Sequence, residues 1–177
     1  QVSVTALVLG FASALGFAWG LWVPGSILLF LAHVLDCTDG NLARAKNLFS
    51  PWGKWLDMIG DRLTETLVLL GVAVHLSSRG AMDWAMLALV DAVLLLLYYY
   101  VVDVGLAMNI LEEAAPSRRI RLKQVEVKWG VFEPVLYGFI VLVPLGLLEV
   151  QLVLTLSLGV GGLVFQAVKS FRRLKGG

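Results

Sequence analysis

The chain has 177 residues, of which 59% are hydrophobic and 15% charged, and its formal net charge is +1. Soluble domains are about 45–50% apolar, so this composition, with a mean hydropathy of +0.84, excludes an ordinary soluble domain and indicates a membrane protein. The single cysteine, Cys37, excludes an intrachain disulfide.

Six apolar segments can be drawn along the chain. Because a spanning helix needs about 20 mostly apolar residues, we predict an all-α integral membrane protein with six transmembrane helices. The whole chain, 1–177, is then one domain. The expected helices cover approximately 2–22, 26–46, 53–75, 82–110, 131–148 and 152–171, with turns at 22–25, 49–53, 75–80 and 146–151. Since the chain opens at Gln1 without a methionine, we expect an upstream piece to be missing.

The basic residues predict the orientation. Loops rich in Lys and Arg stay on the cytoplasmic side of a membrane. If both termini of a six-helix protein lie on that side, every Lys and Arg of this chain except Arg79 also lies there. This predicts a multi-pass protein of the cell membrane in which residues 35–62 face the cytoplasm. Basic residues that border a bilayer give no support for nucleic-acid binding.

Four aspartates fall within this cytoplasmic stretch. Asp36 and Asp39 lie one turn apart on the expected second helix, and Asp57 and Asp61 do so on the third, so a hairpin would bring the pairs together. Four carboxylates at the edge of an apolar slab repel one another unless cations bind. Hard oxygen ligands favour magnesium, manganese or calcium over zinc. The pattern therefore predicts a divalent metal site, against the alternative of a solvated acidic surface.

Small and basic residues beside the acids suggest a phosphate ligand. Gly40 and Ala43 leave space next to the helix, and the Arg44 guanidinium suits phosphate oxygens. Ser50, which precedes a proline, fits a helix N-cap and would leave free amides near Gly53 for an anion. The alternatives are helix packing for the small residues, membrane anchoring for Arg44 and capping alone for Ser50.

The stretch as a whole matches a known signature. The pattern D-x2-D-G-x2-A-R-x8-G-x3-D-x3-D is met at every spacing by Asp36, Asp39, Gly40, Ala43, Arg44, Gly53, Asp57 and Asp61. It resembles the signature of the CDP-alcohol phosphotransferase family. The resemblance implies transfer of a phosphoalcohol from a CDP-linked donor, such as CDP-diacylglycerol, to an acceptor hydroxyl, with release of CMP in phospholipid biosynthesis. It also implies two divalent metal ions, Mg²⁺ or Mn²⁺, and a homodimer.

The same resemblance assigns roles to residues. Metal ligands would be the four aspartates, Asp36, Asp39, Asp57 and Asp61, and Asp61 would also be the catalytic base. Nucleotide and diphosphate would contact Gly40, Ala43 and Arg44, joined by Ser50 and Gly53. Two dications would offset much of the negative charge of four carboxylates and a diphosphate. A carboxylate bound to a metal is a weak base, so the base role of Asp61 requires an outward orientation or a shared proton.

The acceptor is less strongly indicated. Arg62 directly after Asp61 resembles the inositol-phosphate-using branch of the family, and the basic run with Arg118, Arg119 and Arg121 would hold an acceptor phosphate. The alternatives are glycerol 3-phosphate, serine or another polyol phosphate as acceptor, and anchoring beside anionic lipid for the run. A divalent-cation transporter is a different reading, but it would spread carboxylates along a membrane path rather than cluster them beside an arginine.

Three further expectations concern packing. Tyr98, Tyr99 and Tyr100 suggest anchoring at headgroup level. Ala12, Gly16 and Gly20 form a ridge of small residues suited to close helix contact. His33 shares a helix face with Asp36, and a hydrogen-bonded structural histidine is favoured there over a metal ligand.

Overall fold

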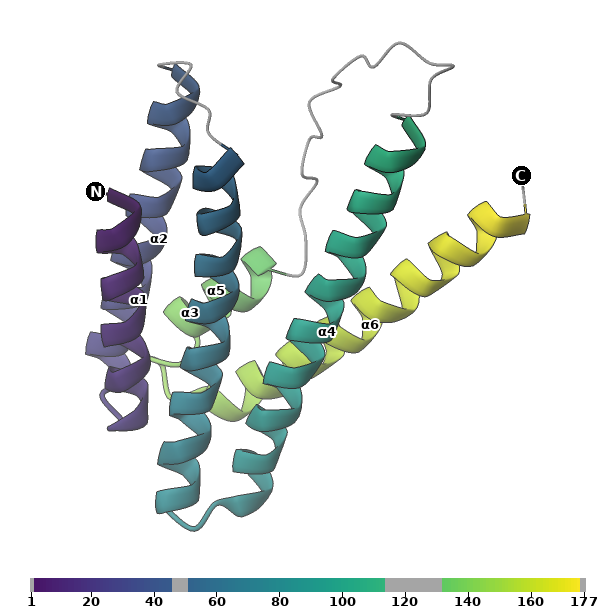
Figure 1. Cartoon of the computed structure of the whole chain (residues 1–177). Helices are drawn as coiled ribbons and strands as arrows, with labels where there is room; N and C mark the ends of the chain where they lie inside the picture. Colours follow the sequence, from purple (N-terminus) through teal and green to yellow (C-terminus); the bar gives the residue numbers. More distant parts are fainter. Residues whose placement is uncertain (1, 46–50, 114–131, 176–177) are drawn as a thin grey trace.

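The computed structural model describes residues 2–45, 51–113 and 132–175, and the side chains of 4–38, 59–102 and 134–169. Six helices account for this part of the chain (Figure 1), which confirms the all-α prediction. They are α1 (Val2–Ala18), α2 (Trp22–Ala45), α3 (Pro51–Ser78), α4 (Met82–Glu113), α5 (Phe132–Val141) and α6 (Leu148–Lys175).

Two of these helices contain stretches that are long and apolar enough to cross a membrane. The stretches are Met82–Val102 in α4 and Leu148–Lys169 in α6, found among the described residues by length and composition. Shorter apolar stretches lie at Val4–Ala18 and Trp22–Thr38. Two helices thus have the length and composition of a membrane span, and the full set of six spans stays a prediction.

The helix ends correct one predicted turn and refine another. The turn predicted at 22–25 is wrong, because α2 already begins at Trp22 and the chain reverses around Gly20, where φ is 73°. Pro24 is accommodated because N–H groups in the first helical turn have no intrahelical acceptor. α3 runs on to Ser78, beyond its predicted end at 75, and the reversal at Gly80, with φ 75°, falls inside the turn predicted at 75–80. The expected start of α3 after Ser50 is confirmed at Pro51.

The fifth helix is shorter than the sequence predicted. The described helix α5 has 10 residues and ends at Val141 rather than at 148. Pro144 explains the early end, because its ring lacks an N–H and clashes with the carbonyl four residues back. The chain then turns at Gly146, where φ is 79°, and α6 begins at Leu148, inside the turn predicted at 146–151.

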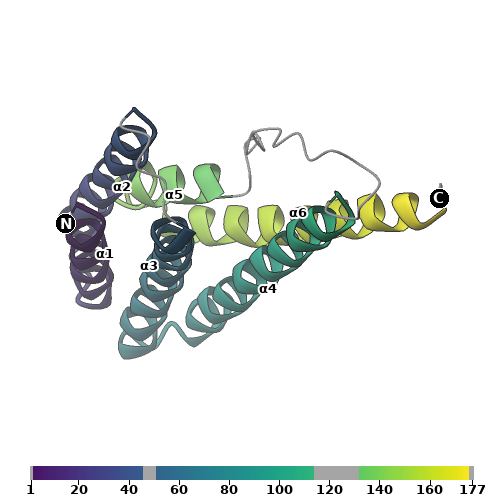
Figure 2. The same ribbon diagram turned by 45° about the horizontal axis from the view of Figure 1, so that its top comes forward.

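Close packing joins the first three helices. α1 lies against both α2 and α3, α3 packs on α4, and α4 packs on α6 (Figures 1 and 2). The predicted small-residue contact is confirmed at Gly16, where a Cβ would lie 3.2 Å from the Cα of Gly25. At the same place Ser13 Oγ donates to the Gly25 carbonyl at 2.8 Å. α1 therefore bridges the two helices that carry the aspartates.

Helix α5 is fastened to the bundle by two buried side chains. Ser26 Oγ of α2 donates to the Phe139 carbonyl at 2.9 Å. From α6, Gln151 Nε2 donates to the Val135 carbonyl at 3.0 Å. These two bonds tie α5 to both of its neighbours, and they fix the α5 side chains that face the interior.

Candidate active site

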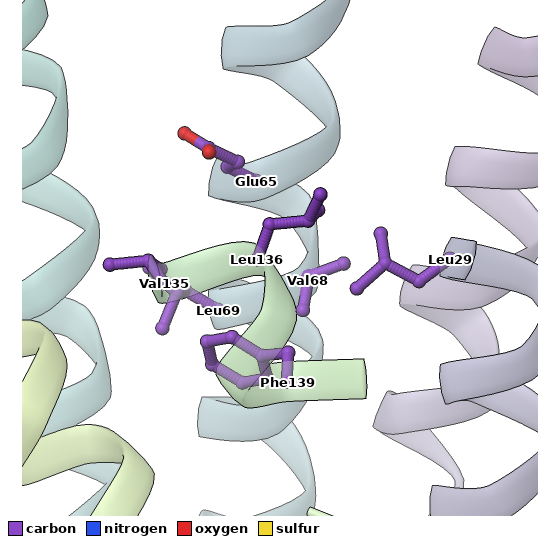
Figure 3. A pocket seen from close by; sticks show the side chains of 7 residues that line it. All are labelled: Leu29, Glu65, Val68, Leu69, Val135, Leu136 and Phe139. Carbon is purple, nitrogen blue, oxygen red and sulfur yellow. The ribbon is translucent and has the colours of Figure 1, made fainter. Parts of the chain in front are cut away.

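A small pocket shows which helix faces meet inside the bundle. Its lining comes from α2, α3 and α5, and consists of Leu29, Glu65, Val68, Leu69, Val135, Leu136 and Phe139 (Figure 3). The stripe of α2 that carries Leu29 is therefore turned toward the stripe of α3 that carries Glu65 and Val68.

Two of the four predicted metal ligands extend these facing stripes. Asp36 comes seven residues after Leu29, and Asp61 comes four residues before Glu65, so each shares the stripe of its pocket residue. Because α2 runs toward the connection at 46–50 and α3 runs away from it, both aspartates lie on the same side of the pocket. Both side chains are partly buried. Asp36 and Asp61 thus continue the pocket-lining stripes of α2 and α3 on the same side of the pocket.

The divalent metal site expected from the four aspartates stays a prediction. Carboxylate oxygens from two facing helices are the donors that magnesium and manganese prefer. Among the side chains that the structure describes, no group of three or more His, Cys, Asp and Glu residues forms a metal site. The other two predicted ligands, Asp39 and Asp57, have helical backbones in α2 and α3, but their side chains lie outside the described ones.

The remaining predicted contacts fall in the same parts of the chain. Gly40, Ala43 and Arg44 belong to the last turns of α2, and Gly53 belongs to the first turn of α3. Their surroundings lie outside the described side chains. Ser50 and the basic run with Arg118, Arg119 and Arg121 lie outside the described residues altogether.

Histidine 33 has structural partners, as expected. Its Nε2 lies 3.5 Å from the Tyr137 hydroxyl of α5 and 3.7 Å from Cys37 Sγ. The His33 and Tyr137 rings meet edge to face, with centroids 5.7 Å apart. The contact with Tyr137 adds a second link between α2 and α5.

The predicted tyrosine anchors are corrected by the structure. Tyr98 and Tyr99 are buried, at 8% and 5% exposure, and only Tyr100 is exposed. In a helix that packs against both α3 and α6, successive residues point about 100° apart, so three adjacent tyrosines cannot share one outer face. Tyr99 instead lies under the Arg62 guanidinium, whose carbon is 3.5 Å from the ring centroid.

Comparison with known proteins identifies the family. A family model described as CDP-alcohol phosphatidyltransferase matches residues 2–167. The chain belongs to this family. The resemblance drawn from the aspartate signature is therefore confirmed.

Individual relatives match over shorter stretches. A "Bifunctional IPC transferase and DIPP synthase" from Aquifex aeolicus (strain VF5) is 37% identical over 95 residues, which is 53% of this chain and 22% of that protein. An "Archaetidylinositol phosphate synthase" from Methanothermobacter thermautotrophicus is 28% identical over 71 residues, or 40% of this chain and 36% of that protein. The matched segments therefore span roughly a fifth to a third of these relatives' lengths.

Glu65 is a buried carboxylate of this CDP-alcohol phosphatidyltransferase chain to which the sequence pattern assigned no role. Glu65 is buried at 7% exposure and follows Asp61 by one helical turn. The available signal was spacing, because Asp57, Asp61 and Glu65 recur every four residues and continue one stripe into the apolar part of α3.

Proposed function

We propose that this protein is a metal-dependent CDP-alcohol phosphotransferase of the cell membrane. It would transfer a phosphoalcohol group from a CDP-linked donor, such as CDP-diacylglycerol, to an acceptor alcohol and release CMP, in phospholipid biosynthesis. The family match over residues 2–167 carries this proposal. The positions of Asp36 and Asp61, on the pocket-lining stripes of two different helices, add support, because phosphoryl transfer needs charge stabilisation from more than one side.

The proposed site combines the four aspartates. Asp36, Asp39, Asp57 and Asp61 would hold two divalent ions, Mg²⁺ or Mn²⁺. When bound, these ions polarise the phosphoryl oxygens and stabilise the departing CMP. Asp61 would accept the proton of the acceptor hydroxyl through an oxygen directed away from metal.

Residues near the 46–50 connection would hold the nucleotide end of the donor. Gly40 and Ala43 leave room for it, and Arg44 would bind diphosphate oxygens through two N–H groups. Ser50 and Gly53 would place helix-terminal amides beside the same anion.

The proposed acceptor is an inositol phosphate. The name of the archaetidylinositol phosphate synthase relative supports this choice, and so does Arg62 directly after Asp61. In this proposal Arg118, Arg119 and Arg121 bind the acceptor phosphate on the cytoplasmic side. The enzyme would work as a homodimer.

The decisive experiment measures CMP release by the purified protein in lipid nanodiscs. CDP-diacylglycerol is offered with inositol phosphate, glycerol 3-phosphate or serine, at controlled Mg²⁺ or Mn²⁺ concentration. We expect release with inositol phosphate, complete loss after chelation with EDTA, and recovery on adding Mg²⁺ or Mn²⁺.

Two variants test the site itself. Asp57→Asn removes one predicted ligand charge and should abolish CMP release while the thermal unfolding curve is retained. Asp83→Asn is the matched control, because Asp83 is exposed in the first turn of α4, at the opposite end of the bundle. Full activity of Asp57→Asn would contradict the proposed metal site. Release with serine or glycerol 3-phosphate but not with inositol phosphate would contradict the acceptor.

A further inference from the structure

Three polar side chains lie buried together beside Asp61. Glu65 and Tyr99 are 7% and 5% exposed, and Arg62 lies across the Tyr99 ring at 3.5 Å. Both Glu65 carboxylate oxygens, the Tyr99 hydroxyl and Arg62 Nε are buried without a hydrogen-bond partner in the described part of the chain. We refer to Arg62, Glu65 and Tyr99 as the interior polar cluster.

Arg62 stacks on the Tyr99 ring, but these buried polar atoms of the cluster make no hydrogen bonds with the described residues. Neither the Tyr99 hydroxyl nor the Glu65 carboxylate has a hydrogen-bond partner in the described part of the chain. Buried polar groups in proteins are nearly always hydrogen-bonded, so four unsatisfied atoms in one place call for a ligand.

The surroundings limit what this ligand can be. Figure 3 shows the apolar side chains gathered on one side of Glu65, whose carboxylate is directed away from them. A group that bonds the carboxylate must therefore lie on the side away from this apolar pocket. That group must donate to carboxylate oxygens and accept from Arg62 Nε–H.

Only some chemical groups meet both demands. A phosphate oxygen would be repelled by Glu65, and an ammonium group could not accept from Arg62. A hydroxyl group does both, because it carries one donor hydrogen and two acceptor lone pairs.

We propose that the interior polar cluster is a subsite for a hydroxyl group of the acceptor, and that it selects polyols over acceptors with few hydroxyls. This inference rests on the transferase function proposed above. Glu65 lies one helical turn from Asp61 on the same stripe, so an acceptor whose reacting oxygen lies near Asp61 reaches Glu65 with a second hydroxyl. A bound water molecule is the other source of the same chemistry, and the experiment separates the two.

The test compares steady-state CMP release by the wild type, Glu65→Gln and Tyr99→Phe. Tyr98→Phe is the control, because Tyr98 is an adjacent buried tyrosine whose ring contacts Tyr99 at 5.4 Å. Loss of a hydrogen bond to a charged group should raise KM for inositol phosphate by about ten- to a hundredfold in Glu65→Gln. A smaller increase is expected in Tyr99→Phe, with KM for the CDP-linked donor unchanged in both.

Deoxy analogues of inositol phosphate identify the contact. Removing the hydroxyl that Glu65 binds should raise KM in the wild type but add little in Glu65→Gln, since both changes remove the same interaction.

If Glu65 binds only water, Glu65→Gln lowers the unfolding temperature and leaves acceptor KM unchanged, which overturns the subsite. If Glu65→Gln does not fold, Tyr99→Phe with the same analogues decides. A wild type that releases no CMP with any acceptor refutes the transferase function, and the subsite with it.

Discussion

Replacing Ser26 by alanine tests how α5 is held over the site. Ser26 is 2% exposed, and its hydroxyl bonds the Phe139 carbonyl near the end of α5. Because α5 ends at Val141, no backbone N–H among the described residues bonds this carbonyl, and Leu142 N donates to Gly138 instead. Ser26→Ala therefore leaves a buried acceptor without its partner.

A second buried serine provides the matched comparison. Ser13 Oγ also donates to a backbone carbonyl, that of Gly25, at 2.8 Å. Gly25 lies inside α2, however, where the helical ladder supplies another donor to the same oxygen. We expect Ser26→Ala to cost about 2 kcal/mol, the penalty of an unsatisfied buried acceptor. Ser13→Ala should cost about 0.6 kcal/mol, as is typical of a side-chain hydrogen bond inside a membrane bundle.

Both costs can be measured by unfolding the purified variants in mixed detergent micelles with increasing sodium dodecyl sulfate. The wild type and a Ser13→Ala, Ser26→Ala double variant complete the set. We also expect Ser26→Ala to weaken acceptor binding, since Val135, Leu136 and Phe139 of α5 line the pocket beside Glu65. Equal destabilisation by the two single substitutions would refute the reasoning, because it would show that the Phe139 carbonyl is no more dependent on its serine than Gly25 is.

Two further predictions concern packing and orientation. Gly16→Ala should lower the free energy of unfolding by about 1–3 kcal/mol, because the new Cβ meets the α2 backbone at 3.2 Å. Gly161→Ala, which meets nothing within 4 Å, should be neutral, and equal effects would contradict the close contact. In a Cys37→Ser background, an impermeant thiol reagent should label Lys169→Cys only from the cytoplasmic side and Arg79→Cys only from the other, and the reverse pattern would contradict the orientation.

The helices could be predicted from the sequence because apolar length and turn residues are local signals. Their ends were less predictable where two signals competed. At 22–25, a proline and a glycine indicated a turn, but Pro24 is tolerated in a first helical turn and Gly20 takes the left-handed conformation instead. After Phe139 the apolar run continues, so hydropathy predicted a longer helix than Pro144 allows.

The candidate site was also only partly predictable from the sequence. The aspartate spacing indicated its position and family, because fixed spacings on a helix define a stripe without knowledge of the rest of the fold. The interior polar cluster could not be found in that way. Tyr99 is 37 residues from Arg62, and only the packing of α4 on α3 brings them together. A run of three tyrosines also favours an interfacial interpretation, which the burial of Tyr98 and Tyr99 corrects.

Glu65 should lower the stability of the fold while it serves the acceptor. A buried carboxylate without a hydrogen-bond partner destabilises the fold, and a leucine at this position would carry no such cost. Glu65→Leu should therefore raise the unfolding temperature if the side chain serves only the acceptor. Glu65 would then be a position where a residue suited to the substrate replaces a residue suited to the core, and its carboxylate would be satisfied only in the complex.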